Sequence, residues 1–107
     1  MGDGNPFAGE VALTLNGERR VLKLTLGALA ELEAGMRADS LVALVERFET
    51  AQFSARDVIA LLLAGLRGGG WEGTSATLVD ADIEGGPLEC TRVAALLLGR
   101  AFALPGA

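Results

Sequence analysis

Residues 54–67 read Ser54-Ala55-Arg56-Asp57-Val58-Ile59-Ala60-Leu61-Leu62-Leu63-Ala64-Gly65-Leu66-Arg67. Between Asp57 and Arg67 no side chain is polar. A surface helix has an apolar stripe of limited width, whereas a helix that is apolar all round is buried on most sides. Ser54 and Asp57 have the spacing of an N-terminal capping motif, and glycines at 68–70 provide a stop. We therefore predict a central helix over residues 54–67, around which the other elements pack.

The composition of the chain indicates which kind of side chain forms the core around this helix. A length of 107 residues fits one domain, and half of the residues are hydrophobic while only 5% are aromatic. The core is therefore expected to be aliphatic. We predict a loose N-terminal arm over residues 1–8 and a single globular domain over residues 9–104.

The charge balance limits the partners. The formal net charge is -5, from 9 basic and 14 acidic residues. Phosphate contacts need clustered Lys and Arg, so we expect no direct binding of nucleic acid and no attraction to anionic membranes. The longest apolar run, residues 58–66, is shorter than the roughly 20 residues that span a bilayer. Since the N-terminus also lacks the pattern of a signal peptide, a cytoplasmic location is expected.

The N-terminal part of the sequence predicts an antiparallel β-hairpin. Apolar residues alternate with others in two runs that flank Asn16-Gly17, a strong signal for a two-residue turn. A two-residue loop pairs Val11 with Leu22, and a four-residue loop pairs Leu13 with Leu22. Both loops place the same side chains on one face, whereas a three-residue loop mixes the faces. We favour the two-residue loop.

Capping residues and apolar periodicity predict further helices on either side of the central one. The first spans about residues 26–37 after Thr25, with Leu26 on its apolar face, and the second follows Ser40. A short helix after Thr74-Ser75 is expected to run through Ile83, and the last helix begins at Pro87 and reaches about residue 103. The predicted fold class is therefore α+β, with an N-terminal antiparallel β-hairpin packed on a bundle of four to five helices.

The sequence offers little chemistry for catalysis. Histidine and tyrosine are absent and Cys90 is the single cysteine, which excludes histidine-based triads and the usual zinc ligand sets. Asp80, Asp82 and Glu84 lack the ligand spacing and the loop glycine of a calcium loop and are interpreted as a solvated acidic face. Cys90, on an apolar helix face, is interpreted as a structural thiol. We expect no enzymatic activity, no cofactor and no metal.

Three apolar side chains are candidates for partner binding. Trp71 lies beside the glycines at 68–70 and is either a lid over the core or a contact residue, since Trp is enriched in binding hot spots. Phe102 and Leu104, near the C-terminus, present the same choice. We expect the central helix to bind nothing itself and recognition to lie at its margins: the glycine segment, which we interpret as a hinge, Trp71 and the groove beside the last helix.

Two blocks of sequence carry a resemblance to a known family. The first runs from Asn5-Pro6-Phe7-Ala8-Gly9-Glu10-Val11 through the hairpin into Leu24-Thr25-Leu26-Gly27-Ala28-Leu29-Ala30-Glu31-Leu32-Glu33. The second runs from Phe53-Ser54-Ala55-Arg56-Asp57-Val58 to Leu66-Arg67-Gly68-Gly69-Gly70. From about Asn5 to Phe102 the chain resembles the small tail proteins of gene transfer agents, phage-like particles that package host DNA. These proteins are grouped with phage tail assembly chaperones.

The resemblance implies a function without catalytic residues. It implies a tail assembly chaperone of a gene transfer agent or prophage-like element, which binds the tape-measure protein, tail-tube subunits or both during tail assembly. The alternative is a structural component of the tail tube or tail junction, because the family is also described as a tail-tube component.

Overall fold

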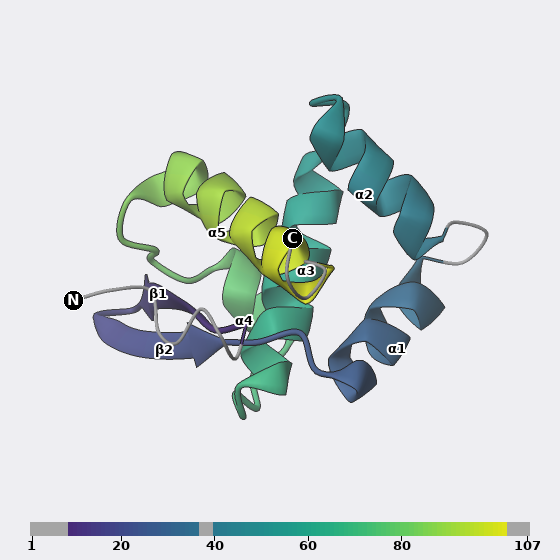
Figure 1. Cartoon of the computed structure of the whole chain (residues 1–107). Coiled ribbons are helices and arrows are strands. Elements are labelled where there is room, and N and C mark those ends of the chain that lie inside the picture. Colours follow the sequence, from purple (N-terminus) through teal and green to yellow (C-terminus); the bar gives the residue numbers. More distant parts are fainter. Residues whose placement is uncertain (1–8, 37–39, 103–107) are drawn as a thin grey trace.

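The structure is a computed structural model, and it describes residues 9–36 and 40–102. The arm predicted for residues 1–8 and the end of the predicted domain at residues 103–104 lie outside this part. The chain begins with the strands β1 (Val11–Leu15) and β2 (Glu18–Leu22). The helices α1 (Leu26–Gly35), α2 (Leu41–Glu49), α3 (Ala55–Gly68), α4 (Ser75–Val79) and α5 (Gly86–Ala101) follow. The predicted α+β class, a hairpin followed by helices, is confirmed (Figure 1).

The hairpin has the two-residue loop that the sequence favours. Val11 pairs with Leu22 and Leu15 with Glu18 in an antiparallel register. Asn16 and Gly17 have φ angles of 52° and 80°, the left-handed conformation that a type I′ turn requires at both central positions. This turn puts the odd-numbered side chains of β1 and the side chain of Leu22 into the core.

Helix α3 lies at the centre of the molecule and packs against α1, α4, α5 and β2 (Figure 1). Ser54 Oγ accepts a hydrogen bond from Asp57 N at 3.1 Å, and the Asp57 carboxylate accepts one from Ser54 N at 2.9 Å. This capping box satisfies two amides of the first turn, as the spacing predicts. Leu61, Leu62 and Leu66 are at most 2% exposed. Burying each such side chain stabilises the fold by about 1.5–3 kcal/mol.

The other predicted caps are present, whereas two expectations about apolar residues are wrong. Thr25, Ser40 and Thr74 each accept a hydrogen bond from the amide three residues later. Leu26, expected on the buried face of α1, is 86% exposed because it occupies the first position of that helix. Helix α4 ends at Val79 instead of reaching Ile83, which forms a β-bridge with Leu15.

The glycines at the end of α3 have a packing role that the sequence did not reveal. A Cβ atom on Gly68 would lie 1.9 Å from Lys23 O, and one on Gly69 would lie 1.9 Å from Val21 O. Lys23 N also donates a hydrogen bond to Gly65 O at 2.9 Å. The backbone of the hairpin therefore lies directly against the last turn of α3. The hinge interpretation rested on glycine content alone and missed this contact.

Candidate partner-binding groove

An apolar groove of about 640 Å³ lies between the first turns of α3, helix α4 with the segment that follows it, and the first turns of α5. We call it the α3–α4–α5 groove. Val58 and Leu62, which are buried, lie on the side of α3, and Val79 is 60% exposed on the side of α4. The other lining residues are mostly apolar: Phe53, Ser54, Ala55, Ile59, Leu78, Ala81, Asp82, Ile83, Gly86, Pro87, Cys90 and Thr91. The groove can thus accept apolar side chains of a partner.

The wall that follows α4 is held in place by the hairpin. Asn16 N donates to Asp82 O at 2.7 Å, and Asp82 N donates to Asn16 Oδ1 at 2.9 Å. Glu84 N donates to Thr14 O at 3.1 Å, beside the bridge between Leu15 and Ile83. These hydrogen bonds fix the wall to β1 and its turn, so the groove is present in the chain alone.

The described charged side chains around the groove that are not in ion pairs are all acidic. Among the described residues, Asp82 is the one charged residue of the groove lining, and Asp80 and Glu84 are exposed in the same segment. In residues 9–36 and 40–102 these three carboxylates make no ion pair. The first turns of α3 and α5 also carry acidic residues, but these are in ion pairs. Asp57 is paired with Arg47, and Glu89 with Arg92 at 2.6 Å. The acidic face expected from the sequence therefore borders an apolar groove.

Cys90 lies in this groove and is half-buried. Burial raises the pKa of its thiol above the ordinary value of 9.0, and the neighbouring Glu89 carboxylate raises it further. A thiol with a raised pKa is protonated at neutral pH and is a weak nucleophile, because the thiolate is the reactive form. Its position therefore fits an apolar contact rather than covalent chemistry.

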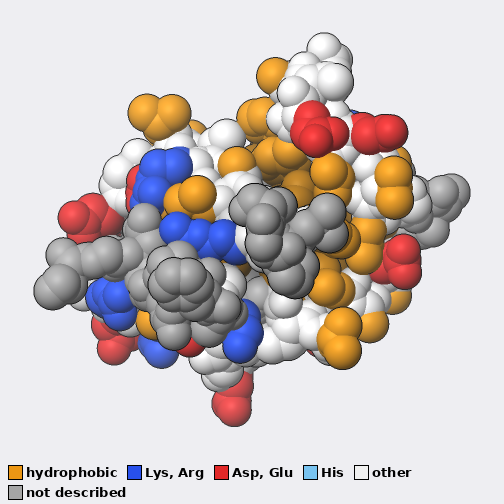
Figure 2. Space-filling model, viewed as in Figure 1, with side chains coloured by type: hydrophobic (Ala, Val, Ile, Leu, Met, Phe, Trp, Pro, Cys, Tyr) orange, Lys and Arg blue, Asp and Glu red, His pale blue; other side chains and the backbone are white. Residues whose placement is uncertain are grey.

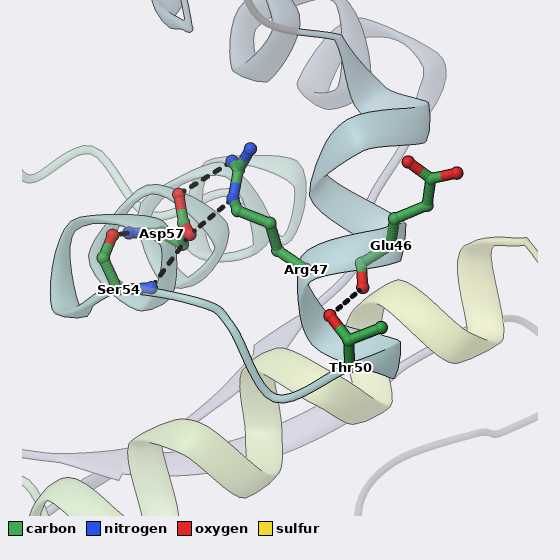
Figure 3. A network of polar contacts seen from close by, with 5 residues as sticks. All are labelled: Glu46, Arg47, Thr50, Ser54 and Asp57. Carbon is green, nitrogen blue, oxygen red and sulfur yellow. Dashed lines mark hydrogen bonds and ion pairs between the residues drawn. The ribbon is translucent and has the colours of Figure 1, made fainter.

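A second pocket, of about 450 Å³, lies between α1, α2 and α3. Its rim carries three arginines, two of which are engaged in ion pairs across the pocket. Arg47 binds Asp57 with two hydrogen bonds, and Arg67 Nη1 lies 3.0 Å from Glu31 Oε1. Figure 3 shows the first of these pairs beside the Ser54 cap and the hydrogen bond from Thr50 to Glu46 O. These side chains join helices to each other, so the α3–α4–α5 groove is the better candidate for a partner.

Of the three candidate residues, the two that the structure describes, Trp71 and Phe102, do not lie at this groove. Trp71 is half-buried against the core, and its indole ring lies so close to Gly73 that a Cβ there would be 2.2 Å from it. Phe102, 43% exposed, is the residue that follows α5. Figure 2 shows apolar side chains gathered between α5 and α2. Leu104 lies outside the described residues. Neither Trp71 nor Phe102 lines the groove.

Sequence reasoning missed the residues that do line it, notably Ile59, Val79 and Ile83. The sequence led us to expect a groove beside the last helix, and Pro87 and Cys90 of α5 form one wall of the groove. Helix α3, which we expected to bind nothing, contributes the opposite wall. One signal was available in the sequence: Val79 directly precedes the residues Asp80, Asp82 and Glu84, which are interpreted as a solvated acidic face.

The part of the chain that the structure describes has neither a cluster of metal ligands nor a helix suited to crossing a membrane. No group of three or more Asp, Glu or Cys side chains there could hold a metal ion. None of the described helices combines the length and the apolar character that crossing a membrane requires.

Comparison with known proteins places the chain in a family. Residues 8–104 match the family model described as phage tail tube protein, GTA-gp10. The match covers nearly the whole chain, so the chain belongs to this gene transfer agent tail protein family, as the resemblance predicts. The family is one of structural tail proteins. No match was found among the curated proteins or among the solved structures.

Proposed function

We propose that the chain is a structural component of the tail tube of a gene transfer agent. The family match over residues 8–104 carries this proposal, because the family is described as a phage tail tube protein. Its description as a structural protein also supports the predicted lack of enzymatic activity. This is the alternative of the two functions that the sequence resemblance implied, and the family description favours it over the chaperone.

Tail-tube subunits are the partners that this function requires. The α3–α4–α5 groove, apolar inside and bordered by carboxylates, is the surface that we assign to such a contact. A stable contact buries about 800 Å² on each partner, so it extends beyond the groove. We place the chain in the cytoplasm during assembly, without direct contact to nucleic acid.

A second candidate function is the tail assembly chaperone, which binds the tape-measure protein, tail-tube subunits or both. The observation that favours it is the same groove, because a preformed apolar groove can hold the apolar face of a partner helix. The chaperone then leaves when the tail is complete, whereas a tube component stays.

Quantitative mass spectrometry of purified particles distinguishes the two functions. A tube component is expected at a copy number comparable to other tail subunits, and its deletion should give particles without complete tails. Absence of the chain from particles, together with loss of tails on deletion, would contradict the tube function and support the chaperone. Normal tails without the chain would contradict both.

A further inference from the structure

We infer that the α3–α4–α5 groove binds an amphipathic helix whose apolar face is flanked by Lys or Arg. This inference deepens the proposed function, because it states the chemistry of the tail-protein segment that the groove recognises. It rests on three features of the described residues: the apolar lining, the preformed wall and the uncompensated carboxylates.

The apolar lining determines which part of a helix enters. Leu62 and Val58 close the groove on the side of α3, while Ile59, Val79 and Ile83 leave apolar surface accessible. A helix presents apolar side chains at positions i, i+3, i+4 and i+7 along one face. The volume of the groove, about 640 Å³, lies within the range of ligand sites, which start at about 300 Å³. The groove can therefore take the apolar side chains of one to two helical turns.

The charge around the groove determines what flanks that face. Asp80, Asp82 and Glu84 lie along the wall after α4, and no Lys or Arg of the described part of the chain lines the groove. The first turns of α3 and α5 also border the groove, but their acids, Asp57 and Glu89, are paired with arginines, so Asp80, Asp82 and Glu84 determine the charge there. An acidic flank on the partner would therefore be repelled, while a basic flank would be attracted.

The test uses the full chain and two synthetic peptides of roughly 14 residues, long enough for about four helical turns. Both peptides have the same leucine face, and they differ in having only Lys or only Glu on the flanks. Fluorescence anisotropy should show that the Lys peptide binds at least about tenfold more tightly, a preference that weakens as salt screens the charges. Equal affinity for the two peptides overturns the inference.

Two pairs of variants locate the binding site. The first compares Asp80→Asn/Asp82→Asn/Glu84→Gln with Glu33→Gln/Glu46→Gln/Glu49→Gln, which removes the same number of exposed charges from α1 and α2. The second compares Val79→Ser with Val42→Ser, because these valines are 60% and 68% exposed, only Val79 lines the groove, and serine removes apolar surface without adding charge. The first member of each pair should weaken binding of the Lys peptide, and the second should leave it nearly unchanged. Equal effects within a pair overturn the inference.

Cys90 provides a reporter that needs no substitution. Bound Lys peptide should slow alkylation of Cys90 by iodoacetamide, because this residue lines the groove. Unchanged alkylation at saturating peptide contradicts binding there. A dimer detected by light scattering and dissociated by Val79→Ser would show that a second copy occupies the groove, which also overturns the inference. These measurements use the isolated protein and test only what the groove binds. The mass spectrometry of particles tests the proposed function separately, so the failure of one can be told from the failure of the other.

Discussion

Arg47 on α2 holds Asp57 in the first turn of α3 through two parallel hydrogen bonds. Nε lies 2.9 Å from Oδ2 and Nη2 lies 3.0 Å from Oδ1. Asp57 Oδ2 also accepts the hydrogen bond from Ser54 N that completes the capping box (Figure 3). One carboxylate therefore both begins the central helix and fastens α2 to it. The stacked rings of Phe48 and Phe53, with centroids 4.5 Å apart, lie at the same junction.

Replacing Arg47 should loosen this junction. Both side chains of the pair are less than one third exposed, and hydrogen bonds to charged groups contribute about 1.5–3 kcal/mol when buried. We expect Arg47→Met to lower the free energy of unfolding by about 1–2 kcal/mol in urea titrations, because partial exposure weakens the pair. Arg56→Met, at an exposed position one residue before Asp57, should change it by less than about 0.5 kcal/mol. Equal losses would show that the pair contributes nothing specific.

The same carboxylate makes stability depend on acid pH. Burial raises the pKa of Asp57, but hydrogen bonds from Arg47 and Ser54 outweigh it and hold the pKa below its ordinary value of 3.8. Because the folded protein has the lower pKa, Asp57 stabilises the fold fully above pH 3.8, and this contribution disappears as the pH falls through the folded value. The stability difference between wild type and Asp57→Asn should therefore shrink below about pH 4 in urea titrations. A difference that is constant from pH 7 to pH 3 would contradict this assignment.

A charge in the middle of α3 should unfold the domain. Leu62 is 2% exposed, and a carboxylate there would be buried without a partner. Such a cost exceeds about 4 kcal/mol, a large part of the 5–15 kcal/mol that stabilises a typical domain. We expect Leu62→Asp to lose its helical circular dichroism, whereas Val79→Asp, at the exposed edge of the same groove, should keep it. A folded Leu62→Asp variant would place this helix on the wrong side of the core.

The hairpin turn can be tested at one residue. Asn16 has a φ of 52° and accepts a hydrogen bond from Asp82 N, so it combines a left-handed backbone with a tie to the groove wall. Asn16→Gly accommodates the backbone conformation and loses only the side-chain hydrogen bond to Asp82 N, while Asn16→Ala loses that hydrogen bond and also strains the backbone. We expect thermal unfolding to rank the stabilities wild type, Gly, Ala, with Ala lower than Gly by about 1 kcal/mol. An alanine variant as stable as wild type would mean that the turn conformation costs nothing.

The features that the sequence predicts correctly are local ones. Ser54 and Asp57 are three residues apart and form the capping box, and Asn16-Gly17 alone selects the turn and hence the register. What the sequence could not show depends on residues far apart in the chain. Ile83 leaves its predicted helix because it pairs with Leu15, and a helical period cannot reveal a strand partner 68 positions earlier.

The groove could not be predicted from the sequence for the same reason. Its walls come from three elements, and each contributes a few residues whose apolar character fits a core equally well. Whether Ile59 or Val79 is accessible is decided by how α4 is placed, and that placement depends on the hydrogen bonds between Asn16 and Asp82. For Trp71 the sequence leaves two interpretations, a lid over the core or a contact residue, and in the structure this residue is partly buried and packs against the core.

The contact between α3 and the hairpin leads to a last prediction. Gly68→Ala would place a methyl group 1.9 Å from Lys23 O, a backbone atom that can move only if the hairpin moves away from α3. Overpacking of this kind costs about 1–3 kcal/mol, and we expect a loss in that range in urea titrations. Gly99→Ala is the control, because this glycine lies inside α5 and the added Cβ would have no atom of the described residues within 4 Å apart from its chain neighbours and the backbone of its own helix. Alanine there should stabilise the protein by about 0.5–1 kcal/mol, since glycine is the weaker helix former. If both substitutions are stabilising, the hairpin does not lie against α3 as closely as described, and glycine at position 68 serves only to end the helix.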